Sequence, residues 1–366
     1  MNRRRWHRNW HRWIAAGGML TMAVACTTAT ATPPPPPATS SRASPPTAAP
    51  VPQLTAAVTE KMARRIHDRY WRLITRSAAT GGTGLSDAEA GLALQLTRAH
   101  YRIQALQGAP VARPRRVTGV RFYIPRITPG TGGSPWFVSD LRRAGGGRTQ
   151  MVYALTRSGW RVIAGTTMRT TSLPRIALDS HGLATSITAD AAGLSVSPRR
   201  VARAHASILS LDPRATSAQD DGKLARIIGP AAYTTQAAAD TRAEQRALRG
   251  QWTMAIDVDV APTLYALRTH DGGAVVWYAL RERMILCSLT NRQPISFNRP
   301  STAALSKGRL FHEQAMAKAA GWYVAAIPPA SSSSTANGRA TVLGDWHSYL
   351  SVTDTVPGGG CTPRQG

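Results

Sequence analysis

The sequence predicts an α+β protein with two tandem domains, each built of helices packed on one face of a curved antiparallel sheet. Three observations lead to this fold class. In residues 54–193, two segments with helical hydrophobic spacing precede short strand-like segments separated by turns. The same order of elements returns in residues 194–356. The two parts also share a local pattern, because residues 136–157 resemble residues 263–281 on either side of a glycine turn.

A basic and then apolar leader occupies residues 1–25. Its first twelve residues hold five arginines and no acidic residue, and the uncharged run from Trp13 ends in small residues directly before Cys26. This order predicts a secretory signal peptide, too short to span a membrane. Cys26 resembles the lipid-modified cysteine of bacterial lipoproteins, so we expect lipidation of Cys26, with membrane lipid as its partner. Ala23 stands where those proteins usually carry Leu, which leaves plain secretion and a retained cytoplasmic leader as alternatives.

Residues 26–53 follow as a segment rich in Pro, Thr and Ser. It contains five consecutive prolines, Pro33 to Pro37, and a single charged residue, Arg42. Prolines favour the extended polyproline II conformation, and too few apolar residues are present to form a core. We therefore expect a disordered tether that holds the folded part away from the membrane. Residues 357–366 are expected to be a flexible tail.

The first expected domain, residues 54–193, opens with an amphipathic helix from Leu54 to Arg76, with Thr55 as its candidate N-cap. Ser86 and Glu89 have the spacing of a capping box at the start of a second helix, which runs to Gly108. Short strands are expected after Pro114, at 120–127, 136–142, 149–156, 160–167, 175–179 and 183–188.

The second expected domain, residues 194–356, opens with a helix at Ser197 and Pro198, which have the N-cap and first-turn residue types. A second helical stretch covers about 235–248. Strands are expected at 252–260, 263–268, 274–286, 310–317, 322–327 and 348–353. By element order alone, these helix-then-sheet units resemble the cystatin and nuclear-transport-factor-like (NTF2-like) cones.

The charge is strongly positive, with 45 Lys and Arg against 19 Asp and Glu, a formal net charge of +26. Only four of the basic residues are lysines, and outside the leader the arginines are spread along the chain. We therefore expect a generally basic surface and no nucleic-acid partner. An anionic envelope polymer or anionic lipid is a possible partner of such a surface.

No motif of a known catalytic or cofactor site is present, so the sequence predicts no enzyme, no catalytic residue, no cofactor and no metal. Asp257 and Asp259 form the best carboxylate pair, because alternate residues of a strand share one face. The simpler interpretation is the polar face of a half-buried sheet; the alternative is a ligand face or a hydrolase site. Trp277 is a further candidate for that ligand face, although core packing is its simpler interpretation. Whether Cys287 and Cys361 form a disulfide is left open.

Several strand motifs carry a family resemblance. They are the segments Val120 to Arg126, Pro135 to Val138 and Leu173 to Asp179 with His181-Gly182, together with the helical pair Arg69-Tyr70. Over residues 54–356 the chain resembles a family of actinobacterial, streptomycete-type secreted lipoproteins with a domain of unknown function. The resemblance implies a lipoprotein leader and a tether, and it implies no catalytic residues.

These observations predict an extracytoplasmic lipoprotein, anchored to the cell membrane, that binds a ligand or an envelope partner without catalysis. Two alternatives remain. One is a cell-envelope hydrolase that uses Asp257 and Asp259. The other is a basic adaptor that binds wall polyanions or anionic lipid, with a steep salt dependence.

Overall fold

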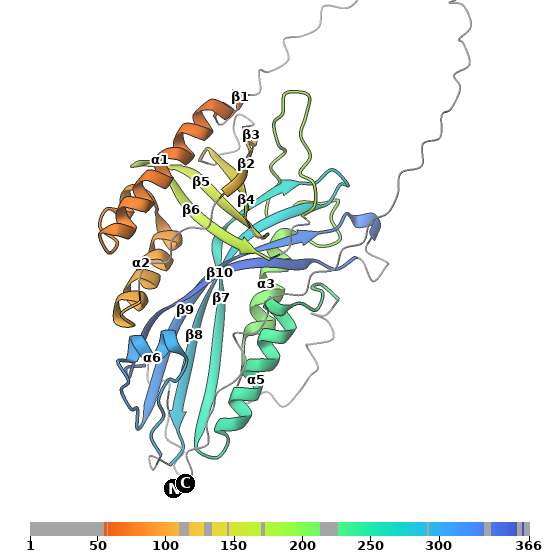
Figure 1. The fold of residues 1–366 in the computed structure, drawn as a ribbon. Coiled ribbons are helices and arrows are strands. Elements are labelled where there is room, and N and C mark those ends of the chain that lie inside the picture. Colours follow the sequence, from red (N-terminus) through yellow and green to blue (C-terminus); the bar gives the residue numbers. More distant parts are fainter. Residues whose placement is uncertain are drawn as a thin grey trace, which may run out of the picture. The chain divides into compact units, whose positions relative to one another are not determined.

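Eight antiparallel strands form the main sheet of the computed structural model, in the order β2-β4-β5-β6-β10-β9-β8-β7 (Figure 1). The structure describes residues 55–56, 58–109, 117–127, 134–144, 146–169, 173–212, 226–290, 293–332, 338–356 and 361. The strands are β2 (Val117–Tyr123), β4 (Trp136–Arg143), β5 (Arg148–Thr156), β6 (Gly159–Met168), β7 (Trp252–Arg268), β8 (Ala274–Ser288), β9 (Gln314–Ile327) and β10 (Thr341–Thr353). A separate two-stranded sheet pairs β1 (Thr55–Ala56) with β3 (Arg126–Ile127). The predicted α+β class and the antiparallel pairing are confirmed.

Each half of the described chain opens with helices, and the second half has further short helices between its later strands. The first half has α1 (Glu60–Ala79), the 3-10 turn η1 (Leu85–Asp87) and α2 (Gly91–Leu106). The second half has α3 (Pro198–Leu209), the π-helical turn η2 (Ala232–Gln236), α5 (Ala237–Leu248), α6 (Pro300–Ser306) and the 3-10 turn η3 (Ala330–Ser332). None of the helices in the described ranges is both long and apolar enough to cross a membrane.

The repeated element order builds two halves of one sheet. In the first half α1 and α2 come before β2, β4, β5 and β6, and in the second half α3 and α5 come before β7, β8, β9 and β10. The last strands of the two halves pair with each other, so the strand order runs outward from β6 and β10 to the edges β2 and β7. Residues 53–366 accordingly form a single compact unit. The prediction of tandem domains is therefore not confirmed, because the expected boundary at 193/194 lies inside this unit.

Two glycines allow β6 and β10 to approach closely. A Cβ atom at Gly165 of β6 would lie 2.7 Å from the indole ring of Trp346 on β10. A Cβ atom at Gly344 of β10 would overlap Met168 and the backbone of β6. Glycine is used where backbones or rings come this close, because any side chain would push them apart. These two glycines thus let β6 and β10 come close enough to pair.

The core lies on both faces of the bent sheet. In the first half, Phe137 and Tyr153 pack with α1, whereas Val152 points to the opposite face. That opposite face packs against Trp277 and Trp322 of the second half, whose other face packs against α3. The buried layers therefore follow one another in the order helices, half-sheet, half-sheet, helices. Each half-sheet can be buried on both faces because successive residues of a strand point to opposite faces.

The helix starts differ from the sequence prediction. Helix α1 is capped by Thr59, whose Oγ1 accepts the backbone N–H of Met62 at 3.2 Å, and not by Thr55. The capping box predicted at Ser86 and Glu89 is wrong, because α2 begins only at Gly91 and Glu89 points into the core. Burial of the Glu89 side chain overrides the local capping preference.

Several strands are longer than predicted. The segments 252–260 and 263–268 form one strand, β7, with an irregularity between Val260 and Leu264 that contains Pro262. Proline lacks an N–H and is tolerated at a bulge of an edge strand. The strand predicted to start at Leu310 begins later, at Gln314. It then continues through Gly321 as the single strand β9.

Candidate functional site

The predicted carboxylate pair lies on an exposed part of the edge strand β7. Asp257 and Asp259 share a face, as predicted, and both are exposed. Across the pairing with β8, Asp257 Oδ2 forms an ion pair with Arg283 Nη2 at 2.6 Å, and Asp259 stands opposite Arg281. The two acidic residues thus each face an arginine of β8, and they do not line a described cavity.

Trp277 is a core residue, so its prediction as part of a ligand face is wrong. Its side chain is 0% exposed, and its indole N–H donates to Gln150 Oε1 of β5 at 3.0 Å. The physical reason is that β8 lies inside the sheet and is covered on both faces, so neither set of alternate residues reaches solvent there.

The cysteines of the folded part are joined. Cys287, in β8, forms a disulfide with Cys361 and thereby fastens the segment after β10 to the sheet. This settles the pairing that the sequence left open. Cys26 and the leader lie outside the described residues.

A row of polar side chains crosses β8, β9 and β10 on the face that packs with α3. Glu282 of β8 accepts a hydrogen bond from the hydroxyl of Tyr323 at 3.3 Å. Its Oε1 also lies 3.3 Å from Nε2 of His347 on β10. His347 and Glu282 remain 25% and 21% exposed, so solvent reaches a pair that is otherwise surrounded by protein. Next along β10, burial raises the pKa of Asp345.

The side chains of Glu282 and His347 can meet across β9 because β9 has a glycine, without a side chain, beside His347. Gly321 is paired with Leu280 on one side and with His347 on the other. A Cβ atom at Gly321 would lie 3.2 Å from His347 and 3.1 Å from Tyr323. The imidazole therefore lies over the glycine, which brings β8 and β10 side chains together.

The charges of this pair stabilise each other. Burial by itself would lower the pKa of His347, but the neighbouring Glu282 carboxylate outweighs it and raises that pKa above its ordinary value. Burial by itself would raise the pKa of Glu282, but the charge and hydrogen bond of His347 hold it below its ordinary value. The protonated imidazole and the carboxylate are therefore the favoured forms.

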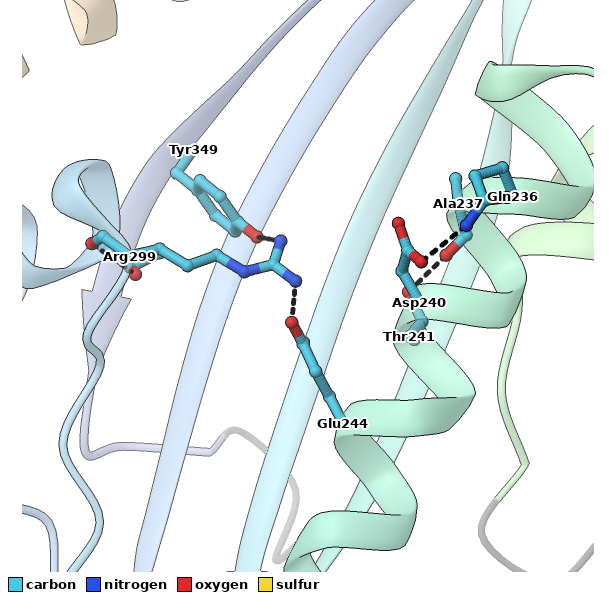
Figure 2. Close-up of polar contacts among 8 residues, drawn as sticks. Gln236, Ala237, Asp240, Thr241, Glu244, Arg299 and Tyr349 are labelled. Atoms are coloured by element: carbon cyan, nitrogen blue, oxygen red, sulfur yellow. Dashed lines mark hydrogen bonds and ion pairs between the residues drawn. The ribbon is translucent and has the colours of Figure 1, made fainter. Parts of the chain in front are cut away.

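Arg299 forms a bridge over the same strands. Figure 2 shows its side chain extending from the loop before α6 across the sheet to Glu244 of α5, where the guanidinium and carboxylate form an ion pair. The other guanidinium nitrogen, Nη1, donates to the hydroxyl of Tyr349 on β10 at 3.4 Å. Arg299 and Glu244 are each a little under half exposed. An exposed ion pair of this kind stabilises a fold little, by about 0–1 kcal/mol.

Each half also buries a neutral histidine between its first helix and its sheet. In the first half, His67 Nδ1 and the Tyr153 hydroxyl are 2.9 Å apart, and the Trp71 indole N–H donates to His67 Nε2 at 2.9 Å. Since Nε2 accepts, the proton of the neutral ring is on Nδ1. Burial lowers the pKa of His67 to about 4.

The second half repeats this contact with the other tautomer. His205 Nε2 lies 2.8 Å from the Tyr233 carbonyl and Nδ1 lies 2.8 Å from the Tyr278 hydroxyl, so Nε2 carries the proton. Burial lowers the pKa of His205 to about 4. Tyr153 and Tyr278 are the matching tyrosines of the repeated sequence pattern, so the repeat visible in the sequence encodes equivalent core contacts.

Glu89 is the most unusual group of the first half. It is 1% exposed and accepts a hydrogen bond from the Tyr70 hydroxyl at 3.1 Å, and its Oε2 has no hydrogen-bond partner among the residues that the structure describes. Burial raises the pKa of Glu89 to about 7, against the smaller opposing effect of the hydroxyls of Thr97 and Tyr70. Beside it, between α1, η1 and β6, lies a cavity of about 170 Å³. Its lining residues are Ile66, Arg69, Tyr70, Leu73, Asp87, Ala88, Tyr153, Gly159 and Trp160.

The family assignment follows from comparison with known proteins. Residues 54–345 match a family described as a domain of unknown function, DUF8094. The chain belongs to this family. No curated protein and no solved structure matches the chain. The DUF8094 match runs through both halves of the sheet and ends in β10 at residue 345, so it includes Glu89 and Glu282 and stops two residues before His347.

The DUF8094 site offers proton-binding and ion-pairing groups. In the described ranges, no group of three or more His, Cys, Asp or Glu has an arrangement that would hold a metal ion. Sequence reasoning missed this site, because Glu282, His347 and Arg299 are 17 to 65 residues apart. Their only local signal was Gly321, which falls where a strand would otherwise carry a side chain.

Proposed function

We propose that this protein is a lipid-anchored extracytoplasmic protein that binds a ligand or partner at the cell envelope without catalysis. The observation that carries the location is the disulfide between Cys287 and Cys361. Disulfides form and persist in oxidising compartments and are rare where thiols are kept reduced. Such a bond is expected of a chain that the leader at 1–25 sends across the membrane.

Anchoring is proposed through Cys26, with residues 26–53 as the tether. This part of the proposal depends on the leader, on the small residues before Cys26, and on the resemblance to actinobacterial lipoproteins. Two acyl chains or one chain plus a second attraction give stable membrane binding, and the basic surface would supply that second attraction.

Membrane fractionation tests the location. Wild-type chain should sediment with membranes, Cys26→Ala should appear in the medium, and the neighbouring control Thr27→Ala should stay membrane-bound. Alkylation before and after reduction should show Cys287 and Cys361 protected only before reduction. Intact, uncleaved chain in the cytosol with free thiols would contradict the proposal.

We propose that the partner binds on the polar face of the second half, where Glu282, His347 and Arg299 lie over β8, β9 and β10. The support is that Glu282 and His347 are partly open to solvent, and that the Arg299–Glu244 pair crosses this face while adding little stability. Hydrogen exchange of α5 and β10, with and without solubilised envelope extract, tests this surface. Protection should appear in wild type and be lost in Arg299→Gln. It should persist in Arg309→Gln, which breaks the exposed Arg309–Asp354 pair outside this row.

The remaining hypotheses differ in their support. The hydrolase alternative is not favoured, because Asp257 is exposed and paired with Arg283. The basic adaptor is favoured by the net charge of +26 and remains a second candidate. If the protein is a basic adaptor, its affinity for anionic membranes or polymers should fall steeply as the salt concentration rises.

A further inference from the structure

A second hollow lies in the other part of the molecule, beside the start of α3. Its volume is about 320 Å³, nearly twice that of the hollow next to Glu89. Its lining residues are Ser195, Val196, Arg200, Arg226, Ile227 and Gly338. None of these residues belongs to the polar row of β8–β10, so the hollow is a separate feature.

Two arginines of this hollow carry charge that nothing in the described chain neutralises. Arg200, in the first turn of α3, and Arg226 are both exposed, and neither has an ion pair or a side-chain hydrogen bond. The contrast is the adjacent Arg199, whose Nε donates to both carboxylate oxygens of Asp190 at 3.0 Å. Two guanidinium groups that share one hollow repel each other unless an anion joins them.

A third polar group at the hollow also lacks a partner. Within the described residues, the Ser195 Oγ atom is shielded from solvent and makes no hydrogen bond, although the Ser195 backbone N–H donates to the Pro328 carbonyl at 3.0 Å. A buried hydroxyl without a partner is costly, by about 1–3 kcal/mol. Turning the Ser195 side chain to the χ1 rotamer that faces the hollow would bring the hydroxyl to a ligand oxygen, which would supply the missing partner.

We propose that this hollow binds an oxyanion of the phosphate class, held by Arg200 and Arg226 and accepting a hydrogen bond from Ser195. Guanidinium groups match the oxygens of phosphate in paired hydrogen bonds. The start of the twelve-residue helix α3 adds a favourable field for an anion. Val196 and Ile227 give the hollow an apolar wall, so a phosphate carried on a small organic group fits better than a bare ion. This proposal goes beyond the proposed function, because the hollow would bind its ligand wherever the protein is located.

Calorimetric titration of the full chain at constant ionic strength tests the site, with inorganic phosphate, glycerol phosphate and phosphatidylglycerol vesicles as three separate probes. The test variant is Arg200→Gln/Arg226→Gln. The matched control is Arg65→Gln/Arg72→Gln, which removes the same two charges from the exposed side of α1. Thermal unfolding of each variant shows whether the fold is kept.

The test variant should bind phosphate at least about 100-fold more weakly, at about tenfold or more for each charged hydrogen bond lost. Ser195→Ala should bind about five- to tenfold more weakly, and the control should stay within about twofold of wild type. Binding of vesicles alone would identify a lipid headgroup as the ligand source, and binding of the soluble probes would identify a free phosphate compound. Equal losses in the test and control variants, or no binding of any probe by wild type, would overturn the proposal.

Discussion

Replacing Glu89 by Gln is expected to stabilise the protein above neutral pH and to have almost no effect near pH 4. Glu89 is 1% exposed, its Oε2 has no partner, and burial raises its pKa from an ordinary 4.5 to about 7. The folded state therefore takes up a proton more readily than the unfolded state. Between the two pKa values the unfolded chain ionises first, so stability falls as the pH rises. Gln keeps the shape of the side chain and an oxygen for the Tyr70 hydroxyl, and it cannot ionise.

The size of the effect follows from the two pKa values. A difference between 4.5 and about 7 corresponds to about 3 kcal/mol, at about 1.36 kcal/mol for each tenfold change in proton affinity. The full amount should be present at about pH 8, about 1 kcal/mol should remain at about pH 5, and nearly nothing should remain at about pH 4. The sign is opposite to that of a carboxylate held by an ion pair, whose removal destabilises a protein at neutral pH.

Urea unfolding of wild type and Glu89→Gln, measured from about pH 4 to about pH 8, gives the difference directly. The matched control is Glu313→Gln, which changes an exposed carboxylate that forms no ion pair with the described part of the chain. The control curve should run parallel to wild type across this range. A Glu89→Gln curve that is parallel to wild type, or that lies below it at pH 8, would show that Glu89 is ionised and satisfied in the folded state.

Three further outcomes are expected. Cys287→Ser should lower the free energy of unfolding by about 4 kcal/mol under oxidising conditions, as the closure of a 74-residue separation implies, and it should match the reduced wild type in urea titrations. Gly321→Ala should lower the free energy of unfolding by about 1–3 kcal/mol through overpacking against His347. Nuclear magnetic resonance should show the pKa of His347 falling toward its ordinary value, and an unchanged pKa would speak against the contact. Trp277→Phe should cost about 2–3 kcal/mol in thermal or urea unfolding, because it leaves the buried Gln150 oxygen without its donor; a neutral effect would mean that water replaces the indole N–H.

The sequence predicted most of the helices and strands, because their signals are local. The spacing of apolar residues along α1 and the Ser-Pro start of α3 depend on neighbours within one or two turns. The likeness between residues 152–157 and 276–281 also proved meaningful, since Tyr153 and Tyr278 make equivalent contacts with buried histidines.

The predictions were wrong where the local sequence pattern favoured one position for a side chain and packing against a remote segment favoured another. Glu89 has the spacing of a capping residue, yet it lies in the core, bonded to Tyr70 nineteen residues earlier. Trp277 lies in a strand whose pattern allowed one solvent-exposed face, yet the other half of the sheet covers that face. In both cases packing against remote segments outweighed the local preference.

By itself, the sequence determined the α+β class, the two copies of the helix-then-sheet order, and the basic character of the chain. Only the tertiary structure decided that β6 and β10 join the copies into one sheet, that Cys287 pairs with Cys361, and that Glu282 and His347 meet across β9. The physical reason is that alternation fixes which residues of a strand share a face, whereas strand partners depend on shape matches such as Gly165 against Trp346, which neither strand reveals alone.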